Sequence, residues 1–172
     1  ESLLVYRRAD GSPVVLSNRC PHRQAPLSMG RKEGDAVRCM YHGLKFDGSG
    51  RCTDIPGQET IPAKLCVRSY PVVERGRWIW VWMGDPTLAD EGLIPDAYTL
   101  KHPDWRFKPG YLHYDADHLL ICDNLLDFSH LSYVHEKTLG GSPNIAQCRP
   151  EVTRVARGVR ATRAVRDTVP AP

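Results

Sequence analysis

A chain of 172 residues, 41% hydrophobic and 25% charged, has the composition of a soluble globular protein and can form one ordinary domain or two small ones. Its formal net charge of +3 comes from Lys and Arg residues spread along the sequence, which argues against nucleic acid as a partner. No run approaches the ~18 apolar residues of a membrane span, and no basic start leads into the apolar segment of a signal peptide, so we expect a cytoplasmic protein with no membrane partner.

Short strands joined by turns are expected over residues 1–85. Asp10 and Gly11 lie between the apolar runs "SLLVYRR" and "PVVLSN", which is a strong hairpin signal. A second strand series surrounds a turn with Gly48 and Gly50, and a third turns at Arg75-Gly76 before the aromatic run "WIWVW". The pattern predicts an all-β domain that ends near Asp85.

The remainder of the chain has a different pattern. Residues 86–110 are rich in Pro and Asp and read as a linker, and a helix is expected from Leu119 to about His135. Two strands are expected around Arg157-Gly158, and we expect the arginines of this tail to face solvent, namely Arg154, Arg157, Arg160, Arg163 and Arg166. The predicted fold class is α+β, with residues 111–172 as the first part of a second domain. Since the chain starts without Met, inside a strand-like run, we expect it to be a piece of a longer protein.

Six cysteines are an even number, which in a small secreted domain would suggest a disulfide framework. This chain has enough other core residues to fold without cross-links, so we expect no disulfides. Two of the six instead belong to a motif, "CPHRQAPLSMGRKEGDAVRCMYHG", in which Cys20 precedes His22 by two positions and Cys39 precedes His42 by three. The turn-prone residues Pro21 and Gly43 allow the side chains of the two segments to converge from neighbouring loops.

The ligand types limit which metal these loops hold. Structural zinc accepts two Cys and two His, but it usually takes the Cys pair from one hairpin and the His pair from one helix. Here each loop supplies one Cys and one His, which suits a Rieske [2Fe-2S] cluster, where two thiolates bind one iron and two imidazoles bind the other. Zinc and ordinary core residues remain the alternatives at this point.

A second group of polar residues lies in "CDNLLDFSHLSYVH". On an ideal helix Asn124, Asp127, His130 and His135 share one broad face. The two imidazoles would nevertheless lie ~140° apart, so we predict a π-bulge, a break or a loose final turn between them. Two histidines and one carboxylate on a facet are the usual ligands of a ferrous ion that activates dioxygen, and by spacing alone Asp127 is a candidate for that carboxylate.

The segments "CPHR", "CMYHG" and "WIWVWMGD" together resemble the N-terminal domain of Rieske non-haem iron oxygenases. Respiratory Rieske proteins carry an additional disulfide between the ligand loops, whereas this chain has Ala25 and Tyr41 at those places. The motifs "DNLLDFSHLSYVHEKTLGG" and "VRCMYHGLKFD" are most similar to the vanillate O-demethylase and toluenesulfonate methyl-monooxygenase group of oxygenase (alpha) subunits.

The resemblance implies an enzyme whose second domain has a helix-grip (START-like) catalytic fold, with Cys20, His22, Cys39 and His42 on the cluster and His130 and His135 on a mononuclear Fe(II). The third iron ligand would be an Asp from a later helix, beyond residue 172. Asp127, with Asn124 nearby, would then hydrogen-bond a ligand imidazole and connect to His42 of a neighbouring chain in a homotrimer. A separate reductase with flavin and NAD(P)H would supply electrons, and O2 would be used for O-demethylation or methyl hydroxylation of a carboxylated aromatic substrate.

Two other functions are consistent with parts of the pattern. A Rieske ferredoxin-type electron carrier would use the first motif alone, and an aromatic ring-hydroxylating dioxygenase would use both. The resemblance does not name the substrate.

Overall fold

The computed structural model describes residues 1–100, 102–136, 143–156 and 158–166. The chain forms two compact units, Glu1–Lys108 and Pro109–Pro172.

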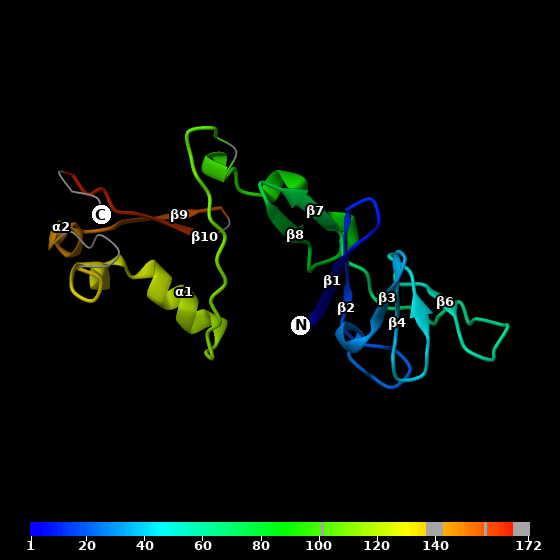
Figure 1. The fold of residues 1–172 in the computed structure, drawn as a ribbon. Coiled ribbons are helices and arrows are strands. Elements are labelled where there is room, and N and C mark those ends of the chain that lie inside the picture. Colours follow the sequence, from blue (N-terminus) through cyan, green and yellow to red (C-terminus); the bar gives the residue numbers. More distant parts are fainter. Residues whose placement is uncertain (101, 137–142, 157, 167–172) are drawn as a thin grey trace. The chain divides into compact units, whose positions relative to one another are not determined.

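The first unit is built from short antiparallel strands (Figure 1). A hairpin pairs β1 (Leu3–Arg7) with β2 (Pro13–Ser17), and a four-stranded meander joins β3 (Arg31–Glu33), β4 (Ala36–Arg38), β5 (Lys45–Phe46) and β6 (Cys52–Asp54) in that order. A second hairpin pairs β7 (Val72–Arg75) with β8 (Trp78–Val81). The hairpins predicted at Asp10-Gly11 and at Arg75-Gly76 are therefore confirmed.

The core of this unit lies between the first hairpin and the meander. Leu16 and Phe46 are fully buried, and the buried apolar cluster around them includes Cys20 and Cys39. The segment that leads into β7 is bonded to β2 through the backbone, since Ser17 N donates to Arg68 O at 2.8 Å and Tyr70 N donates to Val15 O at 3.0 Å. The two cysteines of the first motif are thus fixed by the core of the unit.

The segment predicted as a linker contains three 3-10 helices: η2 (Pro86–Leu88), η3 (Glu91–Leu93) and η4 (Tyr98–Leu100). Asp85 and Asp90 accept hydrogen bonds from backbone N–H groups two residues later and so begin η2 and η3. Up to Lys108 this segment belongs to the first unit.

The second unit combines helices and a hairpin. Its helices are α1 (His118–Leu126), the 3-10 helix η5 (Phe128–Ser132) and α2 (Pro143–Gln147), and its hairpin pairs β9 (Glu151–Val155) with β10 (Gly158–Thr162). The expected all-β domain followed by an α+β unit is confirmed, as are the two strands of the tail.

The prediction of one helix from Leu119 to about His135 is wrong. The α-helix ends at Leu126, and Asp127 is both its C-cap and the N-cap of η5, with a carboxylate that accepts from Ser129 N at 2.9 Å. A short side chain that caps the next turn offers the backbone an alternative to the continuing helix, and periodicity does not reveal this competition. Gly140 and Gly141, an adjacent glycine pair that would be expected to stop a helix over this stretch, lie outside the described residues.

In the described part of the chain, no helix has the length and apolar character required to cross a bilayer.

Candidate metal centres

The two loops of the first motif have the same backbone hydrogen bonds. Cys20 N donates to Ala25 O at 2.9 Å, and Cys39 N donates to Leu44 O at 2.8 Å. In both loops the cysteine carbonyl accepts, at 2.9 Å, from the N–H of the residue four positions later. The sequence does not display this equivalence, because the histidines stand at different spacings.

The loops bring like donors together. The thiols of Cys20 and Cys39 interact with each other, and each cysteine is only 2% exposed. The imidazoles of His22 and His42 are exposed and lie edge to face with ring centroids 4.4 Å apart. The first motif thus forms a buried sulfur pair and a surface nitrogen pair.

Burial raises the pKa of the Cys20 thiol, because the interior disfavours the charged thiolate. Hydrogen bonds from the backbone at His22 and Arg23 lower this pKa, while contact with the Cys39 thiol raises it. The backbone hydrogen bonds favour the thiolate form of this buried pair, and a bound cation would neutralise the remaining charge. The site is therefore suited to two metal-binding thiolates.

No group of three or more His, Cys, Asp and Glu side chains, within the residues that the structure describes, is arranged to hold a metal ion. The four motif side chains are divided into a sulfur pair and a nitrogen pair instead. A [2Fe-2S] cluster with two thiolates on one iron and two imidazoles on the other requires this division, so the donor set fits that group.

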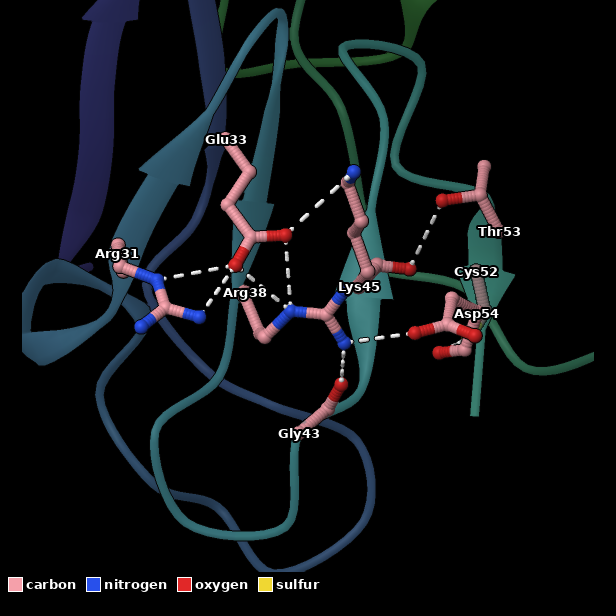
Figure 2. Close-up of polar contacts among 8 residues, drawn as sticks. All are labelled: Arg31, Glu33, Arg38, Gly43, Lys45, Cys52, Thr53 and Asp54. Carbon is pink, nitrogen blue, oxygen red and sulfur yellow. Dashed lines mark hydrogen bonds and ion pairs between the residues drawn. The ribbon is translucent and has the colours of Figure 1, made fainter. Parts of the chain in front are cut away.

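Arg38, which the sequence reasoning did not single out, holds the second loop (Figure 2). It is the last residue of β4 and precedes Cys39, and its guanidinium contacts Glu33, Asp54 and the carbonyl of Gly43. An arginine beside a cysteine carries no recognisable spacing signal, since its partners lie on other strands.

His130 and His135 lie close together in the second unit, with ring centroids 5.3 Å apart and ring planes at 68°. His130 belongs to η5, and His135 follows in a bend after the turn at Tyr133 and Val134. The segment between the histidines therefore leaves the α-helical path, which agrees with the predicted loose final turn. Two imidazole donors at this separation can share one cation.

Asp127 contacts His130 through the backbone. The ring Nδ1 of His130 hydrogen-bonds the Asp127 carbonyl oxygen, which leaves Nε2 available as a metal ligand. Hydrogen bonds from Ser129 lower the pKa of the Asp127 carboxyl, with smaller contributions from the charges of His130 and Arg163. Asn124 lies one helical turn earlier, on α1.

Arg163 fastens η5 to α2. Its Nη2 donates to Ser129 Oγ and its Nη1 to Ile145 O, both at 3.2 Å, while Ala146 N donates to Ser132 Oγ at 3.0 Å. The prediction of a solvent-facing arginine is wrong for Arg163, which is half-buried. Within the described residues its Nε is a buried donor without a hydrogen-bond partner.

Two family models match the chain. Residues 1–71 match the Rieske [2Fe-2S] domain, and residues 114–172 match the vanillate O-demethylase oxygenase C-terminal domain.

Several known proteins are similar over most of this chain. The toluene-4-sulfonate monooxygenase iron-sulfur subunit of Comamonas testosteroni is 55% identical over 92% of the chain and 45% of its own length. The dicamba O-demethylase oxygenase component of Stenotrophomonas maltophilia is 49% identical over 77% of the chain and 40% of its own length. A vanillate O-demethylase oxygenase subunit of a Pseudomonas species is 41% identical over 81% of the chain and 42% of its own length. The chain thus spans less than half the length of these relatives.

A solved structure has the same fold. Dicamba monooxygenase bound to dicamba superposes with a TM-score of 0.83 at 40% identity, over 98% of this chain and 51% of that protein. The paired Cys/His loops, the two domain models and this superposition agree: the chain belongs to the Rieske non-haem iron oxygenases, in the group that includes the vanillate O-demethylase and toluenesulfonate monooxygenase oxygenase subunits.

Proposed function

We propose that this chain is part of the oxygenase component of a Rieske-type aromatic monooxygenase. The observation that supports it best is the presence, in one chain, of paired Cys/His loops and a downstream histidine pair with ring centroids 5.3 Å apart. An electron carrier needs the loops alone, whereas an oxygenase needs both donor sets.

In this proposal Cys20 and Cys39 bind one iron of the cluster, and His22 and His42 bind the other. The cysteines exclude water from the sulfur side, since they belong to the apolar core. The imidazoles lie at the surface, where the ring nitrogen that does not bind iron can hydrogen-bond a docked protein. The exposed imidazoles would therefore form the side on which a bound cluster could exchange electrons with a partner.

His130 and His135 bind the mononuclear Fe(II) in the same proposal. The Asp127 carbonyl orients the His130 ring through Nδ1, which leaves Nε2 available to bind the metal. The third ligand is the Asp that the family resemblance puts beyond residue 172. When bound, the cluster and the iron supply one-electron storage and dioxygen activation.

The domain limits, assembly and location form part of the proposal. Residues 1–85 form the cluster domain, 86–110 a linker and 111–172 the start of the catalytic domain. The oxygenase is a cytoplasmic homotrimer in which the Asp127 carboxylate, beside Asn124, links the iron site to His42 of the neighbouring chain. A separate NAD(P)H-dependent reductase with flavin supplies the electrons.

The reaction balances for an aryl methyl ether. The ether, O2, two electrons from NAD(P)H and two protons yield a phenol, formaldehyde and water. One oxygen atom enters the methyl group, whose C–O bond to the ring oxygen then breaks, and the other oxygen atom leaves as water. A carboxylated aromatic substrate is the class that this proposal favours.

Turnover by the full-length protein with a reductase and NADH tests this function. With methoxybenzoates as probes we expect one formaldehyde for each O2 consumed, and with 4-toluenesulfonate the corresponding benzylic alcohol. A ring cis-dihydrodiol as product would identify a dioxygenase instead. A protein that contains the cluster, lacks a second kind of iron site and consumes no O2 would be an electron carrier.

A further inference from the structure

Arg38 contacts the second cluster loop at both of its ends. The backbone of Arg38 leads into Cys39, and its Nη1 reaches back to the carbonyl oxygen of Gly43, the residue after His42, at 2.5 Å (Figure 2). A single side chain thereby closes the segment that contains one thiol and one imidazole.

The guanidinium is itself anchored to two other strands of the meander. Its Nε lies 2.9 Å from each carboxylate oxygen of Glu33 on β3, and its Nη1 lies 2.7 Å from Asp54 Oδ2 on β6. The Arg38 and Glu33 side chains are 20% and 23% exposed, so solvent screens this ion pair less than it would at the surface. Any movement of the Gly43 carbonyl must therefore disturb a network that spans the sheet.

The first cluster loop differs at the matching place. Arg19 precedes Cys20 as Arg38 precedes Cys39, but Arg19 is exposed. The two arginines thus put equal charge next to equivalent cysteines, and the contacts of Arg38 with the sheet and with Gly43 distinguish them. Arg31 provides a second comparison. It lies on β3, a strand outside the ligand loops, and its Nη2 is 2.6 Å from Glu33 Oε1.

We propose that Arg38 is a positioning residue for the [2Fe-2S] cluster, because its guanidinium fixes the Gly43 carbonyl to β3 and β6 and so sets the orientation of His42. This inference rests on the proposed binding of the cluster by Cys39 and His42. Arginine is required, since a lysine ammonium cannot serve three acceptors from one planar group.

Cluster release from the purified full-length protein measures this role without turnover. We compare Arg38→Lys and Arg38→Gln with Arg19→Gln and Arg31→Gln, following the loss of visible absorption in excess chelator and the EPR line width of the reduced cluster. Loss of a group that orients a metal ligand typically weakens a site by about 10- to 100-fold. We expect the Arg38 variants to release the cluster faster by that factor and with broadened EPR lines, and the Arg19 and Arg31 variants to stay within about twofold of wild type.

The lysine variant keeps the proposal testable if Arg38→Gln fails to fold, because it preserves the charge opposite Glu33 and Asp54. Wild-type release rates and line widths in Arg38→Lys would overturn the proposal, and so would equal acceleration in Arg19→Gln. Failure of the proposed cluster binding is a separate result. In that case the wild-type protein would show no cluster signal, or a Cys39→Ser variant would keep the cluster signal of wild type.

Discussion

Gln24 and Gly43 occupy equivalent places in two loops of identical hydrogen bonding, each donating its N–H to the carbonyl of the cysteine four residues earlier. Both have a left-handed backbone, with φ of 62° at Gln24 and 77° at Gly43. Glycine adopts this conformation readily, whereas a residue with a Cβ pays about 1 kcal/mol for it. The two loops are therefore one turn built with different residues, and substitutions in them have opposite effects.

Gly43→Ala should destabilise the cluster domain. A Cβ at this position would approach Pro56 Cγ to 2.6 Å, and the left-handed φ would be strained in addition. Together these effects predict a loss of about 2 to 4 kcal/mol in the free energy of unfolding. Urea denaturation of the variant, with cluster content as a second readout, checks the prediction.

Gln24→Gly is the matched substitution in the first loop. Removing the Cβ relieves the left-handed strain, and the greater entropy of glycine in the unfolded chain offsets part of the gain. We expect the free energy of unfolding to rise above that of wild type by less than about 1 kcal/mol. A loss as large as that of Gly43→Ala would contradict the equivalence of the two loops.

Asp127→Asn separates the carboxylate's charge from its capping role. Asparagine is as good an N-cap as aspartate, so the turn from α1 into η5 should persist, and both metals should stay bound. Turnover should stop, because the proposed link to His42 of the neighbouring chain requires the carboxylate. Metal analysis tests whether the variant keeps both metals, and single-turnover kinetics test whether it forms product. Turnover at the wild-type rate would show that the Asp127 carboxylate does not link the two sites.

Asp127→Ala is the control for this experiment. It deletes the side-chain oxygen that accepts from Ser129 N, and a lost N-cap costs about 0.5 to 2 kcal/mol. We expect lower thermal stability in this variant and unchanged stability in Asp127→Asn. If the two variants were equally destabilised, the carboxylate charge would be needed for folding itself.

Arg163→Gln should weaken binding of the mononuclear iron while leaving the cluster intact. The arginine ties η5, which contains His130, to α2 through Ser129 Oγ and Ile145 O. Loss of this support should reduce ferrous affinity by about tenfold. Titration of the iron-depleted protein checks this, with Arg160→Gln, an exposed arginine on β10, as the control that should change nothing.

Acid should destabilise the meander through Glu33. Hydrogen bonds from Arg31 and then Arg38 lower the pKa of Glu33 to about 2, from an ordinary value of 4.5. A depressed folded-state pKa contributes stability that is complete above about pH 4.5 and disappears as the pH falls toward 2. The urea midpoint of the cluster-free protein should therefore differ between wild type and Glu33→Gln near pH 6 and converge near pH 2. A pH-independent difference would argue against ionic stabilisation.

The hairpins were predictable because turn residues act locally. Asp10-Gly11 and Arg75-Gly76 each separate two apolar runs, and the strands on either side of each turn pair antiparallel, as a hairpin requires. The convergence of the two Cys/His segments was predictable as well, because their spacing and their turn residues are visible in the sequence. These features depend on residues near one another along the chain.

The features that sequence reasoning missed depend on tertiary contacts. Nothing in the series Arg154, Arg160, Arg163 and Arg166 distinguishes Arg163, whose acceptors lie on η5 and α2. Gln24 carries no sign of a left-handed φ, because glycine is the usual signal for that conformation. The helix end at Asp127 was hidden for a related reason, since an Asp on the polar face fits both a continuing helix and a cap.

Nitrogen hyperfine couplings of the reduced cluster test the central claim most directly. In full-length protein labelled with ¹⁵N-histidine, electron-nuclear double resonance should detect two coupled imidazole nitrogens, and His42→Cys should leave one. A [2Fe-2S] signal without histidine coupling, or wild-type coupling in the His42→Cys variant, would contradict the assignment of His22 and His42 as cluster ligands.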